Sequence, residues 1–572
     1  MQTSIFNADD DNDHSLVSSE SYSLSTSLSN ISARSLAQDE EPKLLKRTPY
    51  EDDTGCSLKV SRTISRKITN SEQILQKAAK STSPLPPMGG GRNYPPPLVG
   101  PEDAYLVVYD GPDDPLCPLS WSKNRKLVNC FAVLVTPFAV QLGSAMYSQS
   151  IPTVMANFKV GHTVATLGTS LFVFGFASGP VIWGPLSELF GRKLILICSM
   201  FGYTCFSFAA ATGQDIQTIM ICRFFSGFTG GAPAVVAPAV TADLFHTADR
   251  GKAMTGFGFV LFAGPMLAPI FGGFAAKNPH LGWRWPMYFT GIASSVALLS
   301  AIFILEETNH QTLLLKRAEE IRRRTGNKAI HAAHEEVSLG IHEILWNNIA
   351  RPLSMLFSEP ILFLISLYNS FVYGILYLLL TEIPLIFSNN YHFERGVAEL
   401  PYISLCIGTI IGCLLVVVFE NRYVRLLKRN GKVRPEERLP GMMLGSFFFS
   451  VGLFWLGWTG DYPRKVHWIV PTVGMSFIGI GLVLIFLPCL TYIIDVYLYV
   501  SASALASNAF LRASFGAAFP LFARQLFLNM QIKWATTLLG CFSVVLIPVP
   551  ILFYKYGANI RKRSKFAYNA VS

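Results

Sequence analysis

The sequence predicts an all-α membrane protein whose twelve transmembrane helices form two bundles of six. Three observations predict this fold: the composition is apolar, long apolar runs recur, and a polar segment divides these runs into two equal sets. Of the 572 residues, 51% are hydrophobic and only 15% are charged, and the mean hydropathy is +0.37. An average soluble domain has about 25% charged residues, so the composition argues against a chain of soluble domains.

Each apolar run is long enough to cross a membrane as a helix, because about 20 residues span roughly 30 Å of hydrocarbon. A helix is the expected structure there, since it satisfies every backbone polar group within its own segment. The predicted spans are 128–148, 164–185, 194–212, 217–241, 253–274, 287–305, 360–381, 400–419, 441–459, 468–494, 500–523 and 536–556.

Basic residues gather in alternate connections between the spans, and the positive-inside rule therefore places both termini in the cytoplasm. This distribution also accounts for the net charge of +10 without a nucleic-acid partner. The connections assigned to the outside contain only scattered cations, such as Lys159, Lys277, Arg395, Arg464 and Lys533. Those assigned to the cytoplasm contain Lys123, Arg125, Lys126, Arg192, Lys193, Arg250, Lys252, the runs 316–328 and 422–438, and the cluster 561–565.

The segments outside the spans are polar. The N-terminal tail is rich in Ser, Asp and Pro and is expected to be disordered. It is either passive or a target of kinases or ubiquitin ligases. A short basic amphipathic helix at 316–324 is expected to lie against anionic lipid. The predicted organisation is a disordered cytoplasmic tail at 1–122, a first six-helix bundle at 123–305, a central cytoplasmic loop at 306–355, a second six-helix bundle at 356–556 and a basic cytoplasmic tail at 557–572.

No pattern in the sequence predicts an enzyme, a cofactor or a metal site. The ten cysteines are scattered without a C-x-x-C pair and are expected to be small buried hydrophobes. His331 and His334 are three residues apart on a segment that supplies no further ligands, so a solvated face is favoured. The chain has no Gly-rich phosphate loop with its lysine, which leaves a proton gradient as the expected energy source.

A loop of small and charged residues, GPLSELFGRK at 184–193, separates the second and third spans. We expect its glycines to supply a sharp turn, its glutamate to cap or face the N-terminus of a neighbouring helix, and its two cations to anchor in lipid head groups. Asp243 is expected to join the same latch. The predicted gate residues are Gly184, Glu188, Gly191, Arg192 and Lys193.

Arg223 is a charged residue in the outer half of the fourth span. A guanidinium at this depth needs an acid, a water-filled cavity or exchanging partners. The pattern R-x-x-x-G at 223–227 resembles the fourth-helix signature of proton-coupled facilitators, and this resemblance implies that Arg223, with a nearby acid such as Asp243, takes part in proton coupling. Structural pairing of Arg223 with a neighbouring loop is the alternative.

Small residues and prolines recur along the fifth span. Glycines at this spacing allow close helix packing, and prolines kink the helix. The segment 264–273 resembles the antiporter signature G-P-x-x-G-P-x-x-G-G of proton-driven exporters, with Ala268 in place of one glycine. The resemblance favours export over uptake. Its key residues are Gly264, Pro265, Pro269, Gly272 and Gly273.

Polar and aromatic residues inside spans 1, 7, 10 and 11 are candidates for a substrate cavity, because polar groups in a membrane interior are costly. Tyr373 and Tyr377 lie one helical turn apart and share a face that suits cations and flat apolar drugs. Ordinary helix packing is the alternative for each candidate. The candidates are Gln141, Tyr147, Asn369, Tyr373, Tyr377, Glu382, Tyr492, Asp495, Asn508 and Arg512.

Over more than four-fifths of its length the chain resembles the major facilitator superfamily, and within it the twelve-span fungal drug:proton antiporters and yeast polyamine exporters. The gate loop matches the loop between helices 2 and 3 of that superfamily. The narrower resemblance is carried by DGPDDP at 110–115, IHAAHE at 330–335, YNSFVYGILY at 368–377 and FLPC at 486–489. It implies a proton-driven exporter of spermine, spermidine, putrescine or antifungal drugs in the plasma membrane, with the vacuolar membrane as an alternative.

Two departures from the exporter pattern bear on the substrate. Glu382 stands one place later than the seventh-span acid of the polyamine exporters, and one residue rotates a helix position by 100°. Ala558 stands where an acid is expected. Fewer carboxylates would weaken polyamine binding more than drug binding. The remaining alternatives are a polyamine or amino-sugar importer of the same fold and a nutrient sensor without turnover. The protein is expected to act as a monomer.

Overall fold

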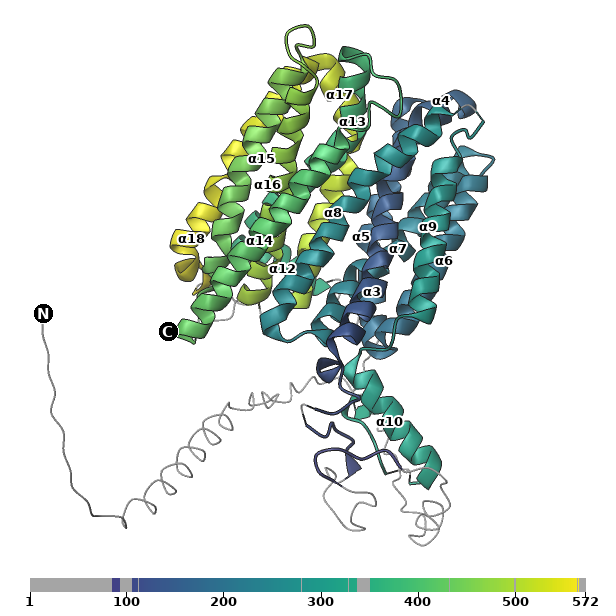
Figure 1. Ribbon diagram of the computed structural model, residues 1–572, viewed down its shortest axis with the longest axis vertical. Helices are drawn as coiled ribbons and strands as arrows, with labels where there is room; N and C mark the ends of the chain where they lie inside the picture. Colours follow the sequence, from purple (N-terminus) through teal and green to yellow (C-terminus); the bar gives the residue numbers. More distant parts are fainter. Residues whose placement is uncertain are drawn as a thin grey trace, which may run out of the picture. The chain divides into compact units, whose positions relative to one another are not determined.

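The fold is known from a computed structural model, in which the described helices form one compact unit together with the loops that join them (Figure 1). Much of the predicted tail at 1–122, including residues 1–84, and residues 565–572 of the predicted basic tail at 557–572 lie outside the described residues. The structure describes residues 85–92, 105–111, 113–278, 280–327, 329–336, 350–431, 433–497, 500–562 and 564.

Long helices follow the predicted apolar runs. Each of the first ten predicted spans corresponds to one helix, extended by a few residues where polar ends continue the turn. The first six are α3 (Lys123–Met146), α5 (His162–Leu189), α6 (Arg192–Thr212), α7 (Ile216–Leu244), α8 (Thr247–Lys277) and α9 (Trp285–Phe303). The next four are α13 (Pro360–Leu385), α14 (Tyr402–Asn430), α15 (Leu439–Gly460) and α16 (Ile469–Val496). Two further helices, α17 (Ser501–Leu546) and α18 (Pro548–Arg561), cover the last two predicted spans.

Short elements connect the long helices. They are η2 (Pro118–Ser120), η3 (Tyr147–Ser150), α4 (Ile151–Phe158), α10 (His310–Thr325), η4 (Ala333–Glu336), α12 (Arg351–Ser358), the π-helix η6 (Ile386–Asn390) and η7 (Pro435–Arg438).

The last two predicted spans form one continuous helical stretch that is broken at Gln531, where φ is 65° and ψ is 159°. Among the described residues, eleven stretches are long and apolar enough to cross a membrane, and the last of them, Ser503–Arg561, has 59 residues. At 1.5 Å per residue that length is about three times the hydrocarbon thickness that one crossing helix spans, so the stretch is too long for a single crossing. The break at Gln531 therefore divides it into the eleventh and twelfth crossings.

The helices pack as two halves, α3 to α9 and α12 to α18. In the first half α5 packs on α7, α3 on α8, and α6 on both α7 and α9. In the second half α13 packs on α17, and α16 packs on both α14 and α15. The halves meet where α5 contacts α17 and where α8 contacts α14 (Figure 1).

Apolar side chains cover the outward faces of the helices. Phe201 of α6 is 61% exposed, Leu414 of α14 is 63% exposed and Val545 of α17 is 70% exposed. In a soluble protein such faces would be polar. Their composition indicates contact with lipid.

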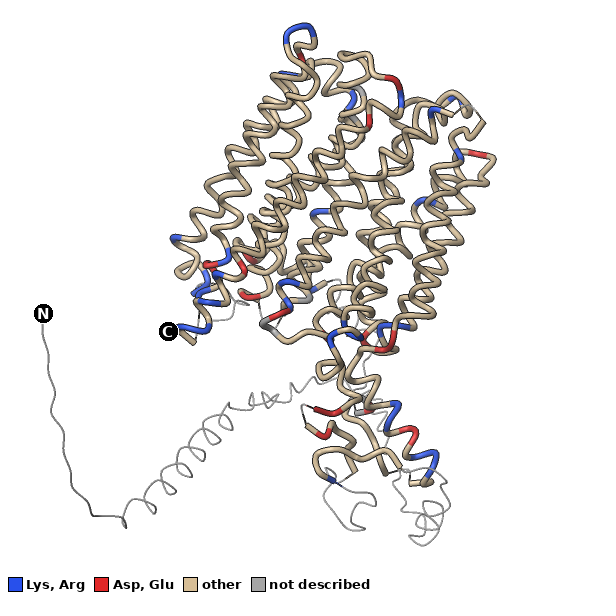
Figure 2. The backbone as a smooth tube through the Cα atoms, in the orientation of Figure 1, with Lys and Arg blue, Asp and Glu red and all other residues tan. Residues whose placement is uncertain are grey.

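Charged residues gather at the end of the helices that carries α10 (Figure 2). We call this end the α10 end and the opposite one the far end. Arg192 lies next to Glu307, which shortly precedes α10, and the last turns of α14 and α18 are basic. The described part of the chain thus has the charge asymmetry from which the orientation was predicted.

The apolar face of α10 packs on the protein's own chain. Ala318 and Ile321 are buried against Met88, Val107 and Ile330. The expectation that this face lies on lipid is therefore wrong, because two flanking segments of the chain cover it. His331, proposed and disfavoured as a metal ligand, is buried next to this cluster, and the side chain of His334 lies outside the described residues.

A buried ion pair joins α10 to the segment that precedes α3. The Arg317 guanidinium donates to Asp114 Oδ2 at 2.9 Å, and the N–H groups of Asp110 and Leu116 donate to the same carboxylate. Burial alone would raise the pKa of Asp114, but these donors outweigh it and lower the pKa below its usual range. The segment and α10 are therefore held together by charge as well as by apolar packing.

Candidate functional site

Candidate cavity residues from three helices meet where the two halves face each other. The Tyr377 hydroxyl of α13 donates to Ser144 Oγ of α3 at 3.0 Å. Tyr373, one turn earlier on α13, donates to the Tyr377 hydroxyl at 3.4 Å. Gln141 is one turn from Ser144 on α3, and its Nε2 is buried without a hydrogen-bond partner. We call Gln141, Ser144, Tyr373 and Tyr377, together with Arg512 of α17, the central layer.

Arg512 is the charged member of the central layer. Its guanidinium carbon lies 4.8 Å from the centre of the Tyr373 ring and 4.9 Å from that of Phe486. The residue is only 8% exposed. No described group accepts a hydrogen bond from its Nε or NH1, both of which are buried. The central layer therefore contains a cation whose Nε and NH1 have no hydrogen-bond partner among the described residues.

Asn369 and Asn508 tie α13 to α17 beside the central layer. Asn369 Nδ2 donates to Asn508 Oδ1 at 3.1 Å, and Asn508 Nδ2 donates to Ser366 Oγ at 3.1 Å. Both asparagines are buried, and Asn369 Oδ1 accepts no hydrogen bond. This pair lies within the second half, so it sets the spacing of two helices that carry Tyr373 and Arg512.

Three of the cavity candidates lie apart from the central layer. Tyr147 belongs with Arg223, as described below. Tyr492 is buried near the α10 end of α16, where its hydroxyl has no partner among the described residues. Asp495 accepts hydrogen bonds from the Arg438 guanidinium and the Tyr423 hydroxyl, so its charge is neutralised at the α10 end. The side chain of Glu382 lies outside the described residues.

Arg223 has hydrogen-bond partners in two neighbouring helices, and they are carbonyl groups. Its guanidinium donates to Gly143 O at 3.0 Å, to Ser144 O at 3.3 Å and to Gly168 O at 3.0 Å. Gly143 and Ser144 lie in the last turn of α3, where carbonyl groups lack intrahelical donors. The expected acid beside Arg223 has no counterpart among the described residues. The partners of Arg223 lie in helices α3 and α5 and not in the neighbouring loop that the structural-pairing alternative assumed.

Two aromatic rings enclose the same guanidinium. Its carbon lies 4.4 Å from the centre of the Phe172 ring and 5.1 Å from that of Tyr147. The Tyr147 hydroxyl donates to Ala165 O at 2.9 Å. A Cβ at Gly227 would lie 2.0 Å from Phe172 O, so the glycine of the R-x-x-x-G pattern allows the close packing of α7 on α5 that places these rings.

The gate loop is built differently from the expectation. Gly184 lies inside α5 and not in a turn. Gly191 does occupy a position that glycine favours, with φ of 96°, at the start of α6. Arg192 does not reach lipid head groups, because its guanidinium donates to Ser187 Oγ at 2.8 Å and to Asp243 Oδ2 at 3.4 Å. The structure thus brings Asp243 into the loop.

Glu307, and not Glu188, caps the N-terminus of α6. Its carboxylate accepts hydrogen bonds from the N–H groups of Arg192 at 2.9 Å and Lys193 at 3.2 Å, which suits a helix N-terminus. The Glu188 side chain is exposed, and its carbonyl accepts from Asn309 Nδ2 at 3.0 Å. Sequence reasoning missed Glu307, although two adjacent acids after the sixth span were a signal in an otherwise basic end.

The glycines of the antiporter motif allow α8 to approach its neighbours closely. A Cβ at Gly264 would lie 2.7 Å from Gln141 Cβ and 2.9 Å from the Leu142 nitrogen, and one at Gly272 would lie 3.0 Å from Gln149 Cγ. Pro265 and Pro269 lie inside the helix. The motif therefore allows α8 to pack closely on α3 at Gln141, a residue of the central layer.

Gly273, the last glycine of the motif, faces a buried carboxyl group of the second half. A Cβ there would lie 2.6 Å from Glu399 Cδ. Glu399 lies in the far-end loop between α13 and α14, is 3% exposed, and accepts a hydrogen bond from Gly396 N–H at 2.7 Å. Burial raises the pKa of Glu399 above its usual range. Sequence reasoning did not identify this residue, because its burial depends on contact with α8.

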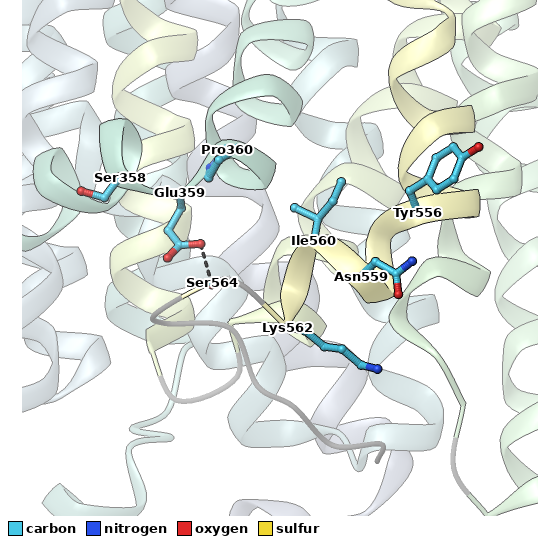
Figure 3. Close-up of a pocket in the computed structure, with 8 residues that line it drawn as sticks. All are labelled: Ser358, Glu359, Pro360, Tyr556, Asn559, Ile560, Lys562 and Ser564. Atoms are coloured by element: carbon cyan, nitrogen blue, oxygen red, sulfur yellow. Dashed lines mark hydrogen bonds between the residues drawn. The ribbon is translucent and has the colours of Figure 1, made fainter.

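A pocket of about 800 Å³ lies at the α10 end of the second half (Figure 3). The Ser564 hydroxyl donates to Glu359 Oε2 across it at 2.6 Å. Glu359 also accepts from the Tyr497 hydroxyl. The pocket lies between the start of α13 and the end of α18 and includes none of the predicted cavity residues. Its lining residues are Ser358, Glu359, Pro360, Tyr556, Asn559, Ile560, Lys562 and Ser564.

Solved structures share this arrangement of helices. The xylose transporter XylE from E. coli, in a partially occluded inward-open conformation, aligns with a TM-score of 0.54 at 16% identity, over 76% of this chain and 98% of that chain. The human organic anion transporter MFSD10 aligns with a TM-score of 0.51 at 14% identity, over 74% of this chain and 99% of that chain. At such low identity these likenesses show the fold alone.

Sequence relatives are more similar. The multidrug transporter FLU1 of Candida albicans is 56% identical over 535 residues, which are 93% of this chain and 88% of the relative. The multidrug transporter TPO1_1 of Candida glabrata is 44% identical over 555 residues, 97% of each chain. The family model of the Major Facilitator Superfamily matches residues 133–520. With its twelve crossings in two packed halves, the chain belongs to the major facilitator superfamily.

Proposed function

We propose that the protein exports drugs, and with them or in their place polyamines, from a fungal cell in exchange for protons. One observation carries this proposal: a buried polar layer with unused hydrogen-bonding groups lies where the two halves meet. A membrane interior retains such groups only at a cost, which favours a binding role. Two relatives at 56% and 44% identity are multidrug transporters, which supports drugs as the cargo.

The proposed orientation places the α10 end in the cytoplasm and the protein in the plasma membrane. The basic residues at that end support it through the positive-inside rule. The central layer then lies between an outer end, which is the far end, and an inner end. Both termini are cytoplasmic in this orientation. A single chain contains both halves, so the proposal needs no second copy.

Alternating access requires the two halves to separate at one end at a time. At the far end, contacts between the halves support a closed arrangement. Lys277 Nζ donates to Glu394 Oε2 at 2.7 Å there, and nearer the central layer Ser170 Oγ of α5 donates to Ala517 O of α17 at 2.7 Å. We propose that these contacts break when the site opens outward. The Tyr377–Ser144 bond lies in the same interface.

The gate loop is the proposed place where proton uptake acts on the conformation. Asp243 pairs with Arg192, and its side chain is 17% exposed. A proton on Asp243 would remove the charge that holds Arg192, and the loop would be released from α7. Arg223 has no carboxylate partner among the described residues, so in this proposal it supports the fold around the site and Asp243 carries the proton.

The test is uptake into inside-out plasma-membrane vesicles with an imposed acid-inside gradient. We expect a labelled azole to accumulate only when the gradient is imposed, and we expect an uncoupler to abolish this accumulation. The same assay with labelled spermidine shows whether polyamines are also carried. Asp243→Asn should remove the dependence on the gradient. Accumulation that ignores the gradient would contradict proton coupling, and no accumulation of either compound would contradict export.

Asp249→Asn is the matched control. Asp249 is also an acid at the α10 end, but its side chain is 66% exposed and its partner Lys252 is 58% exposed. An ion pair this exposed contributes little. We therefore expect the control to retain gradient-driven accumulation, with surface expression measured for both variants.

A further inference from the structure

Among the described residues Arg223, Arg317, Arg512 and Arg561 are buried arginines, and Arg512 differs from the other three because its side chain donates no hydrogen bond to a described group. Arg223 is 3% exposed and donates to three carbonyl oxygens. Arg512 is 8% exposed, and its Nε and NH1 donate to no described group. An arginine is always charged in proteins and has five N–H donors. A buried charge without partners is costly, so the state of Arg512 requires a reason.

The surroundings of Arg512 offer donors and rings but few acceptors. The guanidinium carbon lies over the rings of Tyr373 and Phe486, and no hydrogen bond joins Arg512 Nε or NH1 to a described group. Gln141 Nε2, on the facing helix of the other half, is another buried donor without a partner. The central layer is thus rich in unused donors, and the described residues contribute no carboxylate to it.

A chain of contacts links these unused donors across the interface between the halves. Tyr373 contacts Arg512 and also donates to Tyr377, which reaches Ser144, one turn from Gln141. Gly264 of α8 supports Gln141 from behind, since a Cβ there would lie 2.7 Å from Gln141 Cβ. An acceptor group that enters between α3 and α17 would meet donors contributed by both halves.

We propose that the central layer binds the ionised carboxylate of an organic acid at Arg512, with Gln141 as a second donor and the rings of Tyr373 and Phe486 against the apolar body. A guanidinium matches a carboxylate in charge and in fork geometry. The same charge repels a polyammonium cation. The inference rests on the proposed function and narrows its substrates to aromatic or lipophilic acids over polyamines.

The first test compares three ligands of equal size that differ in charge: 2-naphthoate, its methyl ester and 2-naphthylmethylammonium. Calorimetric titration of the purified full chain in lipid nanodiscs gives each dissociation constant. We expect 2-naphthoate to bind at least about tenfold more tightly than the ester, the difference expected for a hydrogen bond to a charged group. Equal binding of the acid and the ammonium compound would overturn the proposal.

The second test removes the cation. Arg512→Gln should abolish the preference for the acid and leave binding of the ester within about twofold, whereas Arg512→Lys should retain part of the preference because it keeps the charge. A preference for the acid that persists in Arg512→Gln would contradict the assignment.

Stability without ligand separates a binding role from a structural one. Because Arg512 makes no hydrogen bond to a described group, Arg512→Gln should unfold at the same temperature as the wild type or higher, as binding sites often sacrifice stability. Arg223→Gln is the matched control and should unfold at a lower temperature, because three buried carbonyls lose their donor. If Arg512→Gln destabilises the protein as Arg223→Gln does, Arg512 is a structural residue and the proposal fails.

The binding result and the transport result can fail independently. If 2-naphthoate binds through Arg512 but vesicles show no gradient-driven accumulation of azole or spermidine, the site stands and export is wrong. If vesicles accumulate the azole but the protein binds 2-naphthoate no more tightly than the methyl ester, export stands and the carboxylate site is wrong.

Discussion

At the scale of single residues, the buried carboxyl group of Glu399 shows how burial changes a titration. Its oxygen accepts one hydrogen bond from Gly396 N–H, and α8 covers it at Gly273. Burial raises its pKa, against the smaller opposing effects of that hydrogen bond and of Arg395. The packed conformation therefore holds the proton more tightly than a solvated one, in which the pKa of a glutamate is about 4.3.

The sign of the pH effect follows from this direction. A raised carboxyl pKa contributes stability below the solvated pKa, and this contribution is lost as the pH rises through the raised value. Glu399→Gln has no proton to lose. The wild type loses its contribution as the pH rises, and the variant does not. We therefore expect the unfolding temperature of Glu399→Gln minus that of the wild type to become more positive from about pH 4 to pH 7. Scanning fluorimetry in detergent measures both temperatures.

Glu394→Gln is the control in the same loop. Lys277 lowers the pKa of Glu394 through a hydrogen bond and its charge, so the sign is opposite and no gain is expected near pH 7. A Glu399→Gln variant that is less stable than the wild type near pH 7 would show that the structure favours the ionised carboxylate.

At the scale of secondary-structure elements, the packing of α8 on α3 depends on the absence of side chains at particular turns. Gly264 has no room for a methyl group next to Gln141 and Leu142. Gly256 lies on the same helix, and the nearest atom to its Cβ would be Leu134 Cδ1 at 3.7 Å, an ordinary contact. An alanine at either position changes helix propensity in the same way, but only at Gly264 does it also disturb the packing against α3.

We expect Gly264→Ala to destabilise the protein by about 1–3 kcal/mol, because overpacking shifts a backbone, and to reduce transport by displacing Gln141. Gly256→Ala should be neutral or slightly stabilising, since alanine favours a helix over glycine. Thermal unfolding and vesicle uptake of both variants provide the check. Equal effects at the two positions would contradict a packing role for Gly264.

At the scale of the whole molecule, the halves are joined by a few polar contacts and by the packing of α5 on α17 and α8 on α14. The clusters of charge at the α10 end each lie within one half: Arg192 pairs with Asp243 in the first, and Arg438 pairs with Glu420 in the second. At the far end, the Lys277–Glu394 pair joins the two halves. Outward opening would have to separate this pair.

A cross-link at this pair should therefore stop transport. We expect the double variant Lys277→Cys/Glu394→Cys to lose vesicle uptake after treatment with a short bifunctional thiol reagent or an oxidant, and an oxidised pair to recover on reduction. Each single variant, treated identically, controls for the native cysteines. Undiminished uptake by the fully cross-linked protein would show that the halves do not separate at this place.

The positions of the crossing helices followed from the sequence by itself. An apolar run in hydrocarbon has to satisfy its backbone polar groups internally, so the length and place of each run determine its helix without knowledge of its neighbours. The loop sequence also predicted a turn that includes Gly191, which has a positive φ, while the break at Gln531 had no comparable signal. The motifs of the fourth and fifth spans likewise pointed to the family to which the chain belongs.

The partner of each charged side chain was decided by the tertiary structure alone. Arg223 meets carbonyl oxygens and not an acid, Glu307 rather than Glu188 caps α6, and Arg512 has no described hydrogen-bond partner. Such contacts join helices far apart in the sequence and depend on how each helix is rotated and which helix lies beside it. A run of apolar residues specifies neither the rotation of its helix nor the helix beside it, because lipid tails and apolar side chains of the protein offer it a similar environment.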